Sequence, residues 1–343
     1  MKRHLNTLFV TTQGSYLSKE GLAVRVQVGK ETKLRLPLHT LGGIVCFGRV
    51  SCSPFLMGAC GEAGVSISFL TERGRFLARV HGYTPGNVLL RREQYRRADR
   101  EEAAVAIAGA MVAAKVANAR TALLRASRDH PENGDPAALR DALIRMDRCL
   151  SDVQRCDSLD GLRGVEGEAA RAYFGVFGHL VTSQKEDFAL RARSRRPPLD
   201  RANALLSFLY ALLAHDARAA CEAAGLDPAV GFLHRDRSGR PGLALDLMEE
   251  FRVFLADRLA LSLINRRQVQ AAGFQVAASG GVRMDDATRK AVLVAYQKRK
   301  QEEIRHPFLG ETTTVGLLLH LQARLLARHL RGDLDGYPPF IWK

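Results

Sequence analysis

The sequence predicts an α+β protein: a small N-terminal β-sandwich-like domain over residues 1–85, then a larger all-α helical domain over residues 86–343. Apolar residues alternate with polar ones through much of the first ninety residues, which is the period of a half-buried strand. From residue 88 onward they recur at spacings of three and four, as on one face of a helix. Gly82–Asn87, which holds two glycines and a proline, separates the two patterns.

The alternation locates the N-terminal strands. Leu22–Val28 places one leucine and three valines on one face, and Leu34–Leu38 places three leucines on one face. Gly29–Thr32 lies between these runs and predicts a hairpin turn. Many short strands joined by glycine-containing turns are typical of a small sandwich. The further elements that we expect are strands at Leu8–Thr12, Gly43–Phe47, Val65–Leu70 and Phe76–Val80, and a single helix at Ser53–Ala63.

The second domain is rich in alanine and leucine at helical spacing. An alanine-rich helix holds Ala104 and continues to Leu124, and later helices cover Ala256–Leu263 and Leu317–Leu326. Gly273–Gly281 contains too many small residues for a helix, which predicts a loop or a short hairpin there.

Composition and charge restrict the class of partner. Hydrophobic residues make up 46% and charged residues 25%, which excludes a mostly disordered or fibrous chain. Lys and Arg exceed Asp and Glu by 15 (51 − 36), which favours a nucleic acid partner; the alternative is a basic enzyme that uses Arg in place of Lys. The best apolar run, Ala103–Ala114, ends at Lys115 and is too short to span a bilayer, so we expect no membrane partner.

Six cysteines and several missing motifs narrow the chemistry. The cysteines form no C-x-x-C pair, which argues against zinc. They are scattered among apolar residues, as free thiols in a reducing compartment are, and we therefore expect a cytoplasmic protein. No P-loop, dinucleotide fingerprint or nucleophile elbow is present, which gives little support to nucleotide hydrolysis or triad chemistry.

Basic residues gather in three clusters of the helical domain. One lies at the start of its first helix, one runs into Pro197–Pro198 and is therefore a loop, and one lies late in the chain. Each cluster alone is typical of a solvated face, whereas three together favour contact with phosphates. The residues expected to bind DNA are Arg91, Arg92, Arg96, Arg97, Arg191, Arg193, Arg195, Arg196, Lys298 and Arg299.

Carboxylates and one histidine suggest a metal site. Asp246, Glu249 and Glu250 lie at i, i+3 and i+4 of an expected helix and should project from roughly one face, although acidic helix capping explains them equally well. A glycine-bearing turn can fold His234 back toward that face. Glu166 stands among small and apolar residues, where a charged carboxylate needs a cation or hydrogen-bond donors. One histidine with two or three carboxylates suits Mg²⁺ or Mn²⁺, and spacing alone leaves the site open.

Four motifs in order resemble a known family. They are Gly164–Phe174, Asp200–Ser207, Gly231–His234 and Leu243–Arg252. Together they resemble the CRISPR adaptation integrase, the metal-dependent endonuclease subunit that inserts new spacers into a CRISPR array in antiviral defence. The resemblance covers nearly the whole chain, because the β-then-α order also fits.

The resemblance implies a site. Glu166, His234 and Glu249 correspond to the family's catalytic metal ligands for Mg²⁺ or Mn²⁺. Asp246 is the rival for the third ligand and otherwise supports the site from behind the ligands. Asn203 corresponds to a supporting polar group, and the alternative is an ordinary residue of a first helical turn.

The resemblance also implies function and partners. A spacer 3′-hydroxyl attacks a repeat phosphodiester, and the substrates are double-stranded and branched DNA. The expected partners are a second copy of the chain, bound through the β domains, and a small second CRISPR-associated adaptation subunit. The tail Gly336–Trp342 either docks that subunit or packs on its own domain. The competing functions are a non-catalytic basic nucleic-acid-binding scaffold and a metal hydrolase of small phosphorylated substrates.

Overall fold

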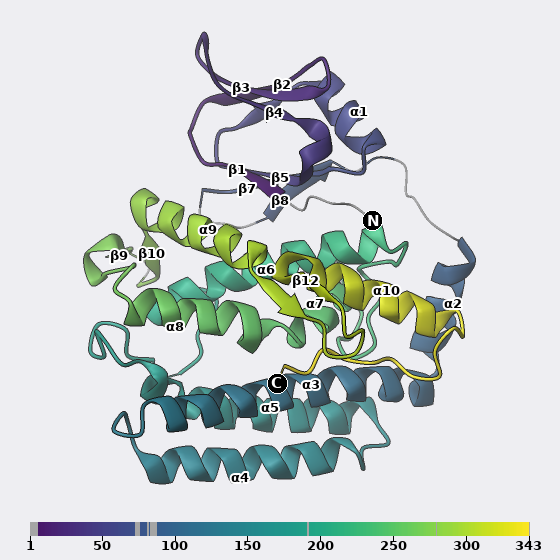
Figure 1. The fold of residues 1–343 in the computed structure, drawn as a ribbon, viewed down its shortest axis with the longest axis vertical. Helices are drawn as coiled ribbons and strands as arrows, with labels where there is room; N and C mark the ends of the chain where they lie inside the picture. The colour runs from purple at the N-terminus through teal and green to yellow at the C-terminus, as the bar shows by residue number, and fades with distance from the viewer. Residues whose placement is uncertain are drawn as a thin grey trace. The chain divides into compact units, whose positions relative to one another are not determined.

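The computed structural model describes residues 6–72, 76–80, 82, 88–190, 192–278 and 280–342. The chain divides into two compact units, residues 1–85 and 86–343 (Figure 1). The first is rich in strands and the second is helical, so the predicted α+β class is confirmed.

The N-terminal unit holds two four-stranded sheets and one helix. One sheet has the order β1-β5-β7-β8 and the other β4-β3-β2-β6. β1, β5 and β7 pair in parallel, and β8 is antiparallel to β7. The elements are β1 Asn6–Val10, β2 Ser15–Glu20, β3 Ala23–Val28, β4 Glu31–Pro37, β5 Leu41–Phe47, β6 Ser51–Cys52, α1 Pro54–Glu62, β7 Ser66–Leu70 and β8 Phe76–Val80.

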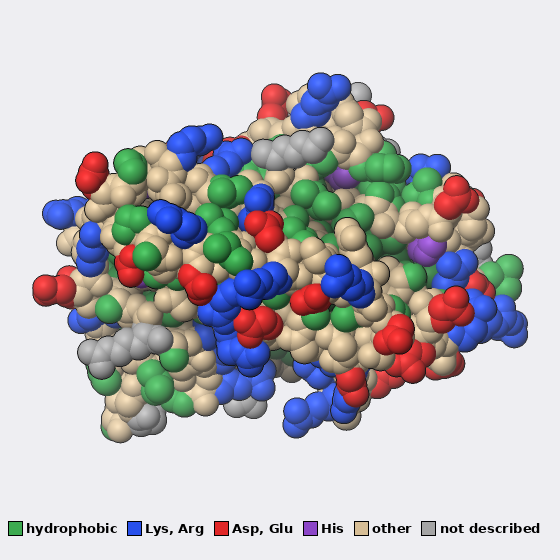
Figure 2. Space-filling view, turned by 90° about the horizontal axis from the view of Figure 1, so that it is seen from below, with side chains coloured by type: hydrophobic (Ala, Val, Ile, Leu, Met, Phe, Trp, Pro, Cys, Tyr) green, Lys and Arg blue, Asp and Glu red, His purple; other side chains and the backbone are tan. Residues whose placement is uncertain are grey.

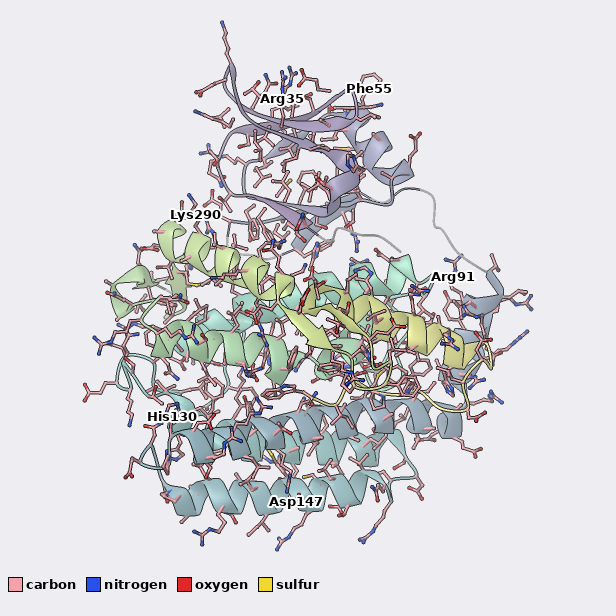
Figure 3. The ribbon with its side chains drawn as sticks, in the orientation of Figure 1. Arg35, Phe55, Arg91, His130, Asp147 and Lys290 are labelled. Atoms are coloured by element: carbon pink, nitrogen blue, oxygen red, sulfur yellow. The ribbon has the colours of Figure 1, made fainter. Side chains whose placement is uncertain are left out.

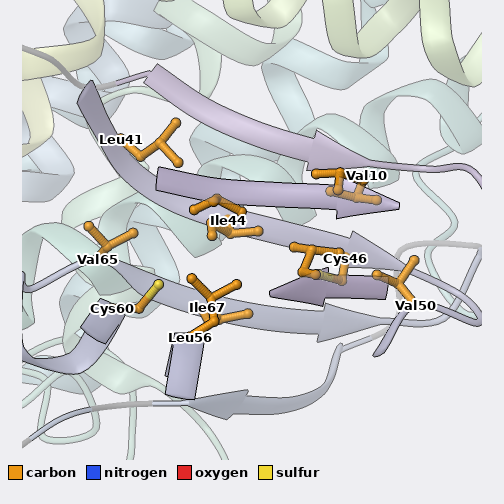
Figure 4. Close-up of a cluster of buried hydrophobic side chains, with 12 residues drawn as sticks. Val10, Leu41, Ile44, Cys46, Val50, Leu56, Cys60, Val65 and Ile67 are labelled. Carbon is orange, nitrogen blue, oxygen red and sulfur yellow. The ribbon is translucent and has the colours of Figure 1, made fainter. Parts of the chain in front are cut away.

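Buried side chains from both sheets and from α1 form one apolar core in this unit (Figure 4). Val24 and Val26 of β3 lie in it, as the alternation predicts. Leu22 and Leu34 do not, since they are 85% and 40% exposed, and that part of the expected pattern is wrong. Leu22 precedes the first paired residue of β3, and β4 is an edge strand whose side chains are mostly exposed.

The second unit consists mainly of helices. α3, α4 and α5 each pack on the other two (Figure 1), and α6 packs on α7 and α10. The stretch Gly273–Gly281, expected to be a loop or a short hairpin, contains β9, which pairs antiparallel with β10 directly after the stretch, so the short hairpin is the correct alternative. The main elements are α2 Val88–Asp99, α3 Glu101–Asp129, α4 Pro136–Val153, α5 Leu159–Gly175, α6 Arg201–Ala223, α7 Gly242–Glu249, a π-helical segment Arg252–Asp257, α8 Arg258–Asn265, β9 Phe274–Val276, β10 Val282–Met284, α9 Asp286–Gln301, β11 Glu303–Arg305, β12 Thr312–Thr314 and α10 Leu318–Leu330.

Two of these helices, α3 and α6, are long and apolar enough to cross a membrane by length and composition. The expectation that no segment reaches that length is therefore wrong. In each helix, 56% of the most apolar window is buried inside the protein, and both helices pack against others of the same unit.

The C-terminal tail packs on its own unit. Tyr337, Phe340 and Trp342 are at most 8% exposed. Asn118 of α3 donates to the Phe340 carbonyl at 2.9 Å and accepts from the Trp342 amide at 2.7 Å. The alternative that the tail packs on its own domain is therefore correct, and docking of a second subunit stays a prediction that could use only what the tail leaves exposed, such as Ile341.

Replacing Phe340 by Ala should destabilise the helical unit by about 3–5 kcal/mol, since the buried ring stacks on Phe251 at 4.9 Å between ring centroids. Urea unfolding followed by the fluorescence of Trp342, the single tryptophan, measures this. Phe308→Ala is the control, because Phe308 is 53% exposed. Similar losses for the two variants would contradict the role given to the tail.

Candidate functional site

Glu166 lies within α5, whose first turn is capped by the Ser158 hydroxyl accepting from the Gly161 amide at 3.3 Å. Its side chain is 27% exposed and forms an ion pair with Lys115 of α3. Lys115 is 8% exposed and lies near the middle of α3, among the buried residues of that helix. The cation that the surroundings of Glu166 demand is therefore supplied by a lysine of the chain itself.

Glu249 is the last residue of α7 and is 2% exposed. Its carboxylate lies 2.7 Å from the Lys115 ammonium and 2.9 Å from the guanidinium of Arg252. Burial by itself would raise the pKa of Glu249, but Arg252 and Lys115 outweigh it and lower that pKa to about 2. Glu249 is thus ionised at neutral pH, as a metal ligand or an ion-pair partner must be.

His234 is held by Asp246 of α7. The imidazole Nδ1 lies 2.5 Å from Asp246 Oδ1, and the same carboxylate accepts the backbone N–H groups of Phe232, Leu233 and His234 at 2.6–3.0 Å. A Cβ at Gly231 would lie 2.6 Å from Asp246 Oδ2, so glycine is needed for this close approach. Among the described residues nothing hydrogen-bonds Nε2, which leaves the lone pair of that nitrogen free to bind a cation when the ring proton is on Nδ1.

The three residues singled out as ligands are brought together only in part. Glu166 and Glu249 share Lys115, and His234 is close enough to Glu249 to help lower its pKa. Within the described ranges, however, no group of three His, Cys, Asp or Glu side chains is placed to hold a metal ion. Asp246 is fully buried and engaged by four hydrogen bonds to the 232–234 segment.

The three acidic residues of α7 and its end do not share a face, so that expectation is wrong. Glu250 points to the C-terminal tail, where it accepts from the Tyr337 hydroxyl at 2.5 Å and the Phe340 amide at 2.6 Å. Burial raises the pKa of Glu250 to about 8. Two neighbouring glutamates therefore have opposite electrostatic surroundings, because only Glu249 meets fixed cations.

Lys115 and Arg252 are parts of the site that the sequence reasoning missed. A lone lysine at the end of the apolar run 103–114 could have indicated Lys115, since a lysine buried there needs an acidic partner. Arg252 follows Glu249 at the i+3 spacing of a helical ion pair.

Asn203 is fully buried near the start of α6. Its amide donates to Asp200 and to the Ala192 carbonyl, and its oxygen accepts from Arg193 and from the Ser194 amide. Asn203 thus fixes the loop before α6. Arg195 from that loop borders a cavity of about 30 Å³ that Lys115, Glu166 and Arg252 also line.

The residues expected to bind DNA differ in exposure. Arg91 is half-buried, and Arg191 lies outside the described residues. Four have partners within the chain: Arg96 and Arg97 with Glu93, Arg193 with Asn203 and Arg299 with Glu302. The exposed ones are Arg92, Arg96, Arg195, Arg196 and Lys298.

Basic residues are spread over the helical unit. Arg91 of α2 and Lys290 of α9 lie toward opposite sides of that unit in the view of Figure 3. On the face seen in Figure 2, Lys and Arg side chains gather near the middle with Asp and Glu side chains beside them. The net charge is therefore distributed over several surfaces of mixed sign.

Comparisons with known proteins place the chain in a family. Residues 8–298 match the family described as CRISPR associated protein Cas1. The chain is 56% identical over 343 residues to "CRISPR-associated endonuclease Cas1 1" of Chlorobaculum tepidum, and the match covers 100% of both chains. Its fold is similar to that of a casposase bound to integration product, with a TM-score of 0.84 and 21% identity over 99% of this chain and 95% of that one. It is also similar to part of a Cas6-RT-Cas1–Cas2 complex, with a TM-score of 0.81 and 24% identity over 99% of this chain and 36% of that one.

The hydrogen bonds of two histidines predict opposite neutral tautomers. His234 should carry its proton on Nδ1, facing Asp246, whereas His306 should carry it on Nε2, because its Nδ1 accepts from the Phe308 and Leu309 amides. Long-range ¹H–¹⁵N correlation spectra of the imidazoles, assigned with His→Gln variants, distinguish the two forms. If neutral His234 carries its proton on Nε2 instead, that nitrogen has no free lone pair and cannot bind a metal ion.

Proposed function

Since this chain belongs to the CRISPR-associated Cas1 family, we propose that it joins spacer DNA 3′-hydroxyls to repeat phosphodiesters by transesterification, using Mg²⁺ or Mn²⁺. It is an endonuclease, as is the relative that it matches along the whole length of both chains. The family implies a nuclease that depends on a divalent metal. The observation that carries the proposal is the pair of carboxylates, Glu166 and Glu249, that meet at one cationic position.

The residues at this position fit a divalent cation. Glu166 and Glu249 offer carboxylate oxygens, and His234 offers Nε2, a donor set that Mn²⁺ accepts and Mg²⁺ tolerates. We assign the ligand role to these three residues. Asp246 is assigned to the orientation of His234, because all its hydrogen-bonding capacity is directed at the 232–234 segment.

The chain's own residues would prepare the reaction. Asp246 keeps the His234 proton on Nδ1, and Arg252 fixes one oxygen of Glu249 so that the other faces Lys115. A divalent ion bound here would neutralise charge that develops on the phosphate. Exposed arginines of the same unit would hold the DNA backbone, as the excess of positive charge supports.

The proposal extends to the partners and the location of the protein. A second copy of the chain, bound through the N-terminal units, and a small second CRISPR-associated subunit would complete the assembly. The casposase named above is bound to integration product, and the other structure is a complex that includes Cas2. This chain shares the fold of both, which supports the proposal. Six free cysteines support a cytoplasmic location.

Glu166→Ala should lower Mn²⁺-dependent cleavage of branched DNA by at least about 100-fold, because it removes a ligand. DNA affinity should stay within about twofold, since exposed arginines supply it. The matched control is Glu168→Ala on the same helix, whose carboxylate pairs with Arg145 and Arg171 away from Lys115. If Glu166→Ala cleaves like the parent, Glu166 is not a ligand and the proposed site is wrong. If the parent binds DNA but cleaves none with Mn²⁺, the scaffold function replaces this one.

Arg92→Ala combined with Arg96→Ala should weaken DNA binding without changing its preference for sequence. The slope of log Kd against log salt should fall by about 2, one unit for each lost phosphate contact. Fluorescence anisotropy between low and moderate salt measures the slope. Arg128→Ala is the control, since Arg128 is exposed and pairs with its neighbour Asp129. An unchanged slope in the double variant would show that the start of α2 does not meet DNA.

A further inference from the structure

Lys115 occupies the space between two carboxylates. Its ammonium contacts Glu166 on α5 and lies 2.7 Å from Glu249 at the end of α7. Its side chain is 10% exposed, and α3 neighbours such as Val112 and Ala119 are buried beside it. The ammonium is thus the cation on which both acidic groups converge.

The Lys115 ammonium and a divalent ion cannot both occupy the position between Glu166 and Glu249. A buried ammonium is stable only when paired, and two carboxylates around one point repel each other unless a cation stands between them. A divalent ion that takes oxygens from Glu166 and Glu249 must stand where the ammonium now stands, within about 2.0–2.6 Å of those oxygens. Lys115 and the ion therefore compete for the same two carboxylates.

We propose that Lys115 is the internal counter-ion of the metal-free site and leaves it when a divalent cation binds. The inference rests on the proposed function in taking Glu166 and Glu249 as ligands. The lysine holds the two carboxylates together before the metal arrives, and it lowers the affinity for the metal by the free energy of its own ion pairs. Metal binding then frees a second cation next to the site.

The structure offers the displaced ammonium a destination. Lys115 borders the 30 Å³ cavity, and the buried carboxylate of Asp257 lines the same cavity. Tyr210 lines it as well and donates to Asp257 at 2.8 Å. A rotation of the flexible lysine stem could bring the ammonium toward these oxygens without moving α3.

Calorimetric titration of Mn²⁺ at pH 8 tests the competition on metal-free protein. Lys115→Met should bind Mn²⁺ at least about tenfold more tightly than the parent and melt at a lower temperature in EDTA. Lys300→Met is the matched control, because Lys300 is buried to a similar extent (6% exposed against 8% for Lys115) and pairs with Asp216 at 2.8 Å, outside the site. It should lose stability without any change in Mn²⁺ affinity. Lys115→Gln replaces the Met variant if the latter does not fold. Equal or weaker Mn²⁺ binding by the Lys115 variant overturns the inference.

Amine labelling of the parent separates displacement from simple repulsion. The labelling rate of Lys115, read by peptide mass spectrometry, should differ several-fold between EDTA and saturating Mn²⁺, because the ammonium leaves Glu166 and Glu249 for new surroundings. The labelling rate of Lys300 should not change. If Lys115 labelling is unaffected by Mn²⁺, the lysine stays in place and the inference fails. If the parent binds no Mn²⁺, or Glu166→Ala binds it as well as the parent does, the proposed metal site itself fails.

Discussion

The helical unit is organised around one buried carboxylate. Glu249 ends α7 almost without exposure to solvent, and an ionised group there is stable only with cations beside it. Arg252 comes from the π-helical segment that follows, and Lys115 comes from α3. Lys115 also forms an ion pair with Glu166 of α5 and so holds that carboxylate beside Glu249. One electrostatic requirement therefore fixes three helices relative to one another, and the position that they share is where the chemistry is proposed.

The acidic residues of α7 and of the position directly after it have different partners. Asp246 folds the 231–234 segment back and orients His234, whereas Glu250 holds the C-terminal tail through Tyr337 and the Phe340 amide. Asn118 of α3 donates to the Glu250 carbonyl at 2.7 Å and binds the same tail. The tail therefore contacts Glu250, the residue next to Glu249 in sequence. By fixing Glu250, the packing of the tail supports the position of the Glu249 carboxylate. The aromatic residues at the C-terminus are in this way part of the support of the site.

Periodicity predicted the architecture and most strands, because burial on one face imposes a repeat that the sequence records. It missed β2, because the sequence Ser15–Glu20 has only Tyr16 and Leu17 as apolar residues and these are adjacent, so neither face of the strand is continuously apolar. It could not assign the parallel pairing of β1 with β5, since the choice of partner is a long-range property. Helical spacing failed for Glu250, because α7 ends at Glu249 and the backbone then turns into a π-helical segment.

The family resemblance and the local chemistry singled out Glu166, His234 and Glu249, but neither could reveal what stands between them. A lysine in a helix is normally solvated, so its burial can be recognised only when the opposing carboxylates are placed in space. Arg193 and Arg252 make the same point for the net charge, since both are directed inward, toward Asn203 and Glu249. The excess of 15 positive charges therefore overstates what is available to DNA. Some of the basic side chains, such as Lys115 and Arg252, pair with acidic groups inside the helical unit. Only the exposed basic residues are available to contact DNA.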